Sequence, residues 1–249
     1  PLIEVEVHLS QGLPSLTIVG LPEAAVRESK DRVRSAIINS GFQFPNKRLT
    51  INLAPADLPK DGSRLDLPIA LGILIASGQL PEQAAEGLEF VGELALDGHL
   101  RPITGILSIA IACQQLGHPL IAPQQNAAEA AQLLNFEVFA AGHLNEVCAH
   151  LAQKAPITAY TAPRTSIIGQ YNFDLADVKG QLRPRRALEI AAAGGHSLLF
   201  KGPPGTGKTL LASRLASILP PLNMQENIEV ASIYSIANSQ HHFGQRPFR

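Results

Sequence analysis

The sequence predicts an α/β protein built from two successive parts, and three observations lead to this prediction. Residues 1–152 alternate short apolar strand patterns with amphipathic helix patterns, as expected for one mixed domain. Residues 195–216 read as a buried strand, a glycine-rich loop and a helix in direct succession. Between the two parts the hydrophobic periodicity lapses and prolines appear. We therefore expect a first domain over 1–153, a linker over 154–170 and a second domain over 171–249.

Composition indicates a folded protein. A hydrophobic content of 45% with 16% charged residues argues against disorder. No apolar run reaches the roughly 18 residues of a membrane span, and no signal peptide is visible, so we expect a cytoplasmic protein without a membrane partner. The chain starts at Pro1 without an initiator Met, so we expect earlier residues in the natural protein. Cys113 and Cys148 lie in apolar helical patterns without metal-ligand spacing, which predicts buried free thiols.

The net charge of −1 conceals an asymmetry along the chain. Residues 1–160 hold 10 Lys and Arg against 16 Asp and Glu, a balance of −6. Residues 161–249 hold 10 against 5, a balance of +5. The second part is therefore the one that attracts the phosphates of a nucleotide or a nucleic acid, although this excess is modest.

Periodicity and turn residues predict the elements of both parts. In the first part we expect strands at 2–9, 15–19, 47–54, 89–94, 100–102, 120–122 and 137–140, and helices at 22–40, 66–76, 103–116, 126–134 and 144–152. The turn residues 12–14 predict that the first two strands form a hairpin, and Asp97-Gly98 predicts a second hairpin. Asp66 is expected to cap the helix that follows it. In the second part we expect a strand at 195–201 and helices at 183–193, 209–216 and 226–236.

A phosphate-binding loop is the most specific motif in the chain. The pattern G-x-x-x-x-G-K-T comprises Gly202, Pro203, Pro204, Gly205, Thr206, Gly207, Lys208 and Thr209. Its glycines let backbone N–H groups curl around an anion, and the start of the following helix adds a partial positive charge. Lys208 would reach the β- and γ-phosphates, and the Thr209 hydroxyl would bind Mg²⁺. ATP and Mg²⁺ are therefore the expected cofactors.

The predicted helix over 22–40 carries four cations interleaved with Glu28 and Asp31, namely Arg27, Lys30, Arg32 and Arg34. One interpretation is an ordinary solvated face with pairs of opposite charge four residues apart. The other is a contact with DNA or a neighbouring subunit. The candidate DNA contacts are Arg27, Lys30 and Arg34.

Two resemblances refine this prediction. Residues 174–181 and 202–209 resemble the start of an AAA+ ATPase of the magnesium-chelatase-like group, which would place Val178 and Gly180 near the adenine. Residues 59–62 and 91–103 resemble the proteolytic domain of Lon-type proteases, which implies an α+β, Lon-protease-like fold for the first domain.

The Ser-Lys dyad of Lon-type proteases is missing from this sequence. Arg64 occupies the motif position of the catalytic serine, and Ser63 lies one position earlier. Ile109 occupies the motif position of the catalytic lysine. Because a serine nucleophile needs a base within reach, we expect no peptidase activity. Arg64 is expected to be a surface residue paired with Asp61 or Asp66.

A Lon-like domain before a magnesium-chelatase-like AAA+ module resembles the ComM/YifB family, as do residues 20–34 and 52–60. The resemblance implies a homo-hexameric, ATP-driven DNA helicase that promotes branch migration on single-stranded or branched DNA in natural transformation and homologous recombination. It also implies that the Walker B acid, the sensor residue and the arginine finger lie after Arg249. We therefore assign no catalytic residue and expect nucleotide binding without turnover. The alternatives are a magnesium-chelatase-type subunit, a peptidase and a non-enzymatic DNA-binding or assembly module.

Overall fold

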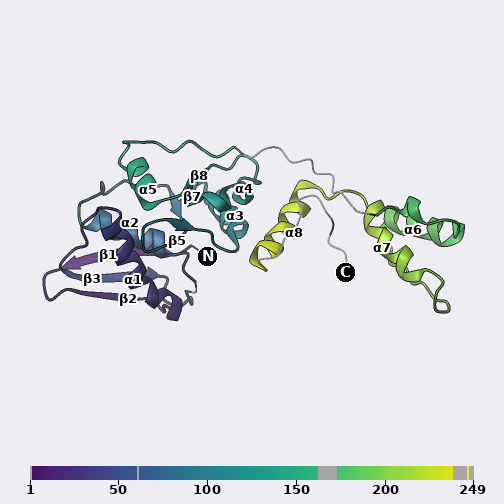
Figure 1. Ribbon diagram of the computed structural model, residues 1–249, viewed down its shortest axis with the longest axis horizontal. Coiled ribbons are helices and arrows are strands. Elements are labelled where there is room, and N and C mark those ends of the chain that lie inside the picture. Colours follow the sequence, from purple (N-terminus) through teal and green to yellow (C-terminus); the bar gives the residue numbers. More distant parts are fainter. Residues whose placement is uncertain (1, 61, 162–172, 238–245, 247–249) are drawn as a thin grey trace. The chain divides into compact units, whose positions relative to one another are not determined.

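The computed structural model describes residues 2–60, 62–161, 173–237 and 246, and the chain divides into two compact units, residues 1–162 and 163–249. We refer to them as unit 1 and unit 2 (Figure 1). The strands of unit 1 are β1 (Glu4–Ser10), β2 (Ser15–Val19), β3 (Arg48–Ala54), β4 (Glu89–Phe90), β5 (Glu93–Leu94), β6 (Leu100–Arg101), β7 (Leu120–Pro123) and β8 (Val138–Ala141). Its helices are α1 (Ala24–Asn39), α2 (Asp66–Ala76), α3 (Ile106–Leu116), α4 (Ala127–Ala130) and α5 (Leu144–Leu151), with a 3₁₀ turn η1 (Gln124–Asn126).

The first sheet has the order β1-β3-β2 (Figure 1). β1 runs antiparallel to β3, with Ser10 opposite Arg48, whereas β2 runs parallel to β3. The predicted hairpin between the first two strands is therefore wrong, because β3 lies between them. The pattern of burial agrees with this order: Leu49, Ile51 and Leu53 of β3 are completely buried, and the most deeply buried strand of the sheet is the one whose two edges are both paired.

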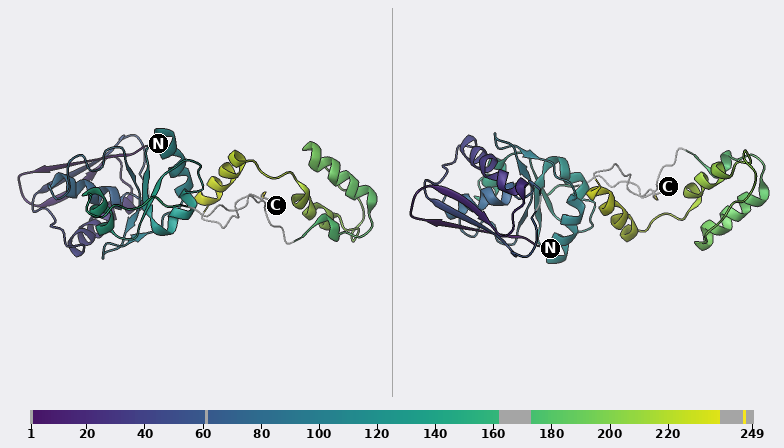
Figure 2. Two further views of the ribbon diagram at one scale, coloured as in Figure 1. Left: turned by 90° about the horizontal axis from the view of Figure 1, so that it is seen from above. Right: turned by 90° about the horizontal axis from the view of Figure 1, so that it is seen from below.

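Helix α2 packs on β1 and contacts α1 (Figures 1 and 2). The main core of unit 1 is built from buried side chains of these helices together with those of β3 and α5. The approach of α2 to β1 depends on Gly72. A Cβ atom at this position would lie 2.7 Å from Cγ2 of Val7, closer than real Cβ atoms come to their neighbours. A glycine in the middle of this helix is therefore a requirement of packing.

A second, parallel sheet has the order β4-β7-β8, and β5 and β6 form a separate antiparallel pair. The hairpin at Asp97-Gly98 is confirmed, but the strand predicted over 89–94 is divided between β4 and β5. The division occurs at Gly92, whose carbonyl accepts a hydrogen bond from the Leu67 N–H (3.1 Å) and whose N–H donates to the Arg64 carbonyl (3.0 Å). These bonds tie the chain to the start of α2 instead of to a strand.

The residues that follow α5 pack against the rest of unit 1. The Tyr160 N–H donates to the Val138 carbonyl (2.7 Å), and Ile157 packs on the main core. Most of the rest of the predicted linker, residues 162–170, lies outside the described residues.

Unit 2 contains the short turn η2 (Leu175–Asp177) and the helices α6 (Leu182–Gly194), α7 (Lys208–Ile218) and α8 (Met224–Ile236). Its small core consists of Leu175, Val178, Leu188 and Leu211. The three predicted helices are confirmed. The strand predicted over 195–201 is wrong, because a strand needs a hydrogen-bonded neighbour and the described residues of unit 2 provide none. Leu199, which was expected to be buried there, is 88% exposed.

The predicted α/β class agrees with this mixture of strands and helices, whereas the Lon-like and AAA+ descriptions stay predictions. Cys113 and Cys148 are buried free thiols, as predicted. Within the described ranges, no helix combines the length and apolar character needed to cross a membrane.

Candidate nucleotide-binding site

The phosphate-binding loop joins directly to the N-terminus of α7. Gly205 and Gly207 have φ values of +78° and +77°, which glycine adopts most readily. Helix α7 begins at Lys208, is 11 residues long and has no acidic residue in its first turn. The exposed loop therefore presents free backbone N–H groups and the positive end of a helix dipole on the same side as a lysine. This combination attracts a polyanion such as a triphosphate.

Lys208 is bent back over the loop. Its Nζ donates to the carbonyl oxygens of Gly202 (2.9 Å) and Pro203 (2.6 Å). The Thr206 hydroxyl also donates to the Pro203 carbonyl (2.9 Å). Charged phosphate oxygens are stronger acceptors than these neutral carbonyls, so Lys208 can exchange them for a phosphate.

Thr209 is exposed in the first turn of α7, beside Lys208. Its hydroxyl oxygen is the kind of hard ligand that Mg²⁺ prefers, and Mg²⁺ usually keeps several waters and bridges to phosphates. The loop, Lys208 and Thr209 therefore fit Mg-ATP. When bound, Mg²⁺ would neutralise phosphate charge, while the chain itself would hold the β- and γ-phosphates.

Gln181, which sequence patterns did not single out, connects the segment that ends at Gly180 to the phosphate-binding loop. Gln181 precedes α6 with φ +49°, and its Nε2 donates to the Thr206 carbonyl (3.2 Å). A Cβ atom on Gly207 would lie 3.0 Å from this Nε2, so the side chain rests against the loop. Its position directly after Gly180 was the available signal.

Val178 and Gly180 occupy the segment that the resemblance places near the adenine. The Val178 side chain is 2% exposed and packs with Leu188 and Leu211. Gly180, with φ +68°, leaves its backbone exposed. Val178 therefore anchors the segment from inside, and contact of either residue with adenine stays a prediction.

The residues near the Lon-like motif do not form a Ser-Lys pair among the described residues. The Ser63 hydroxyl donates to the Glu93 carboxylate. The ammonium group of Lys60, which is buried, donates to the Pro55 carbonyl. Ile109, in the lysine slot, is a half-buried apolar residue of α3. Ser63 and Lys60 therefore bind other partners, and the absence of peptidase activity stays a prediction.

Asp66 and Arg32 form the most deeply buried ion pair in the described part of the chain. Arg32 Nε and Nη2 donate to Asp66 Oδ2 (2.9 Å) and Oδ1 (3.2 Å), and the Leu94 N–H also donates to Oδ2 (3.2 Å). Burial raises the pKa of the Asp66 carboxyl, and the hydrogen bonds from Arg32 and Leu94 oppose this shift. The hydrogen bond to Asp66 raises the pKa of Arg32.

This pair corrects two expectations. Asp66 does not cap α2 with its side chain, and Arg32 does not belong to a solvated helix face, because the carboxylate and the guanidinium bind each other. The expected surface ion pair between Arg64 and Asp66 is also wrong, because Asp66 is completely buried. Asp61, the other expected partner, lies outside the described residues.

The three candidate DNA contacts on α1 lie in different environments. Arg34 is exposed, with its guanidinium 4.9 Å from the centroid of the Phe44 ring. Lys30 is half-buried. The side chain of Arg27 lies outside the described part of the chain.

The sequence is similar to proteins of one family. Two family models match: "Subunit ChlI of Mg-chelatase" over residues 5–126 and "Magnesium chelatase, subunit ChlI" over residues 174–249. The whole chain is 52% identical to YifB of Salmonella typhimurium, 50% identical to YifB of Escherichia coli and 48% identical to the competence protein ComM of Haemophilus influenzae. The chain belongs to the magnesium-chelatase-like ComM/YifB family. It spans about half the length of these relatives, since it covers 50% of each.

Proposed function

We propose that this member of the ComM/YifB family binds Mg-ATP through residues 202–209 and is part of an ATP-driven motor that acts on DNA. The observation that carries the proposal is the loop in front of α7, where two glycines with positive φ, Lys208 and Thr209 surround one helix N-terminus. Family membership supports nucleotide and Mg²⁺ as the ligands.

For the whole protein we propose a cytoplasmic homo-hexamer that moves along single-stranded or branched DNA and promotes branch migration. The printed name of the Haemophilus influenzae relative connects it to competence, which fits a role in the recombination of incoming DNA. Hydrolysis would need a carboxylate and an arginine that stabilise the transferring phosphoryl group. We assign neither of these in residues 1–249, so we expect binding without steady phosphate release by this chain alone.

Titration with a fluorescent ATP analogue in the presence of Mg²⁺ tests the binding site. Lys208→Ala should weaken binding about 10- to 100-fold, because a hydrogen bond to a charged group contributes about 1.5–3 kcal/mol. Lys201→Ala is the matched control, because Lys201 is an exposed lysine just before the same loop. Equal affinities for the two variants would refute the proposed site. Steady phosphate release that Lys208→Ala abolishes would refute the absence of turnover.

A magnesium-chelatase-type subunit is the second candidate, since the names of both family models refer to that enzyme. The two candidates differ in what ATP drives. Assays of the full-length protein for unwinding of branched DNA and for metal insertion into a porphyrin separate them. Unwinding without metal insertion supports the DNA motor, and the reverse result supports the chelatase.

A further inference from the structure

At one end of the first sheet in unit 1, the strands and the segments next to them carry no carboxylate. Residues 7–22 and 40–56 contain no Asp or Glu, although residues 1–160 carry an overall balance of −6. Lys47 and Arg48 stand where β3 begins, and Ser10 and Ser15 are the residues aligned with Arg48 on the neighbouring strands. The acidic residues of β1 lie toward the other end, with Glu6 opposite Asn52, about 13 Å from Arg48 along β3.

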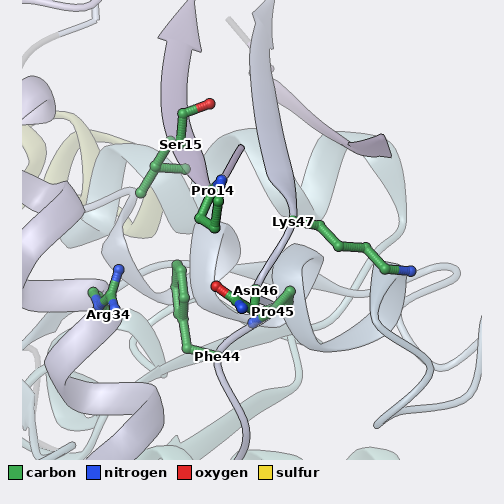
Figure 3. Close-up of a pocket in the computed structure, with 8 residues that line it drawn as sticks. Pro14, Ser15, Arg34, Phe44, Pro45, Asn46 and Lys47 are labelled. Carbon is green, nitrogen blue, oxygen red and sulfur yellow. The ribbon is translucent and has the colours of Figure 1, made fainter. Parts of the chain in front are cut away.

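A pocket opens at this carboxylate-free end (Figure 3). The pocket is small, with a volume of about 80 Å³, so it is a shallow recess that can hold part of a ligand and not a site that encloses a whole small molecule. Figure 3 shows the Phe44 ring between the guanidinium of Arg34 on one side and Asn46 and Lys47 on the other, with Pro14 and Ser15 above it. The amine of Lys47 points outward, away from the pocket.

The cations of this surface are not neutralised by carboxylates. No ion pair with a described residue is formed by Arg34, Lys47 or Arg48. In contrast, Arg32 forms an ion pair with Asp66, and Arg101 forms one with Glu93. The only recorded partner of the Arg34 guanidinium is an uncharged ring. These three cations are therefore available to an external anion.

We infer that this pocket and its cations bind single-stranded nucleic acid. The phosphates would lie against Arg34, Lys47 and Arg48, and one sugar or unstacked base would lie at the mouth of the pocket beside Phe44. Single-strand sites combine a basic surface with aromatic and arginine planes that stack on bases, and this pocket supplies both. Ser15 and Asn46 line the same pocket and offer hydrogen bonds to a sugar or a base edge. A duplex keeps its bases stacked inside, so it would use the cations alone.

The inference does not depend on ATP, because no residue of the pocket belongs to the phosphate-binding loop. It deepens the proposed function by giving unit 1 its own contact with the DNA strand. The 249-residue chain should therefore bind an oligonucleotide without nucleotide present.

Fluorescence anisotropy with a labelled 15-nucleotide oligothymidylate tests the inference, with a 15-base-pair duplex for comparison. Arg34→Gln and Lys47→Gln should each weaken binding about fivefold at about 0.1 M salt, and each should lower the slope of log K against log salt by about 0.7. Lys154→Gln is the matched control, since it removes one exposed charge elsewhere in unit 1 and should leave affinity unchanged. The single strand should bind more tightly than the duplex.

Three results would overturn the inference: an equal loss for Lys154→Gln and Lys47→Gln, unchanged affinity in both pocket variants, or duplex binding as tight as single-strand binding. Lys208→Ala separates the two proposals. It should weaken ATP binding about 10- to 100-fold and leave oligonucleotide binding intact. If it abolished oligonucleotide binding instead, the phosphate-binding loop would be the contact and the pocket would not.

Discussion

The two units of the chain use their apolar residues in opposite ways. In unit 1 the helices and strands enclose completely buried side chains such as Leu53, Leu67 and Ile73. In unit 2 the core is limited to a few residues around Val178, and large apolar side chains such as Leu182 (79%), Leu199 (88%) and Ile233 (67%) are exposed. Burial of apolar surface is the dominant stabilising contribution to folding. Unit 1 is therefore expected to be the more stable part of this chain.

Arg32 of unit 1 and Lys208 of unit 2 have different partners. In unit 1 the Arg32 guanidinium binds a buried carboxylate, and Glu93 binds both Ser63 and Arg101. In unit 2 Lys208 contacts only neutral oxygens of its own loop. The Arg32–Asp66 pair is part of the buried interior of unit 1, whereas the Lys208 ammonium can exchange its neutral acceptors for those of a ligand. The following predictions test this contrast.

The largest expected effect is the loss of the Arg32–Asp66 pair. Arg32→Ala should destabilise unit 1 by about 3–5 kcal/mol at pH 7, because it leaves a buried carboxylate without its cation. Peptide-resolved hydrogen exchange of the β3 amides measures the stability of unit 1 separately from that of unit 2. Arg32→Met combined with Asp66→Leu should be much closer to the wild-type stability, since the buried charge is gone. A double variant as unstable as Arg32→Ala would contradict this explanation.

The same variant should depend on pH in a defined direction. Burial raises the pKa of Asp66 in the folded state, and Arg32→Ala removes a partner that opposes this rise. A raised folded pKa stabilises the fold below the unfolded pKa, near 4, and the stabilisation disappears as the pH rises through the folded pKa. The penalty of Arg32→Ala should therefore be smaller at pH 4 than at pH 7. An equal penalty at both values would exclude Asp66 ionisation as its cause.

The thiols of unit 1 should be nearly inert in the folded state. Burial raises the pKa of Cys113 and of Cys148 from 9.0 to about 12. Because the thiolate is the reactive form, alkylation near pH 8 should be about a thousandfold slower in the native chain than in urea. Unit 1 should also lose stability as the pH rises from about 9 toward 12, since only the unfolded thiols ionise freely there. Rapid native labelling of either cysteine would show that its helix opens.

One substitution made in both units compares their cores directly. Leu53→Ala removes a completely buried side chain of β3 and should cost about 2–5 kcal/mol. Leu199→Ala removes a side chain that is 88% exposed and should change stability by about 0.5 kcal/mol or less. Hydrogen exchange of α2 for the first and of α6 for the second reports each effect. Similar costs for the two variants would show that Leu199 is buried in solution.

The smallest expected effect concerns Gln181. Gln181→Ala removes the hydrogen bond to the Thr206 carbonyl, worth about 1 kcal/mol, so ATP affinity should fall about fivefold. Gln225→Ala, on the exposed face of α8, is the matched control and should leave the affinity unchanged. The stability of unit 1 should not respond to either change. An unaltered ATP affinity in Gln181→Ala would mean that the bond does not hold the loop in its binding shape.

Local patterns determined much of this protein from the sequence alone. The helices over 66–76 and 224–236 and the loop over 202–209 follow from hydrophobic periodicity, caps and glycines that lie within a few residues of one another. Such signals need no distant partner. Family membership follows from the same local motifs.

Only the tertiary structure decided which residues meet across the chain. It placed β3 between β1 and β2, paired Arg32 with Asp66 across 34 positions and brought Gln181 to Thr206 across 25. Among the described residues, it gave residues 196–201 no strand partner, and it exposed Leu199. Each of these outcomes depends on which surface is buried and which hydrogen-bonding partner is available, and neither quantity is written in a local stretch of sequence.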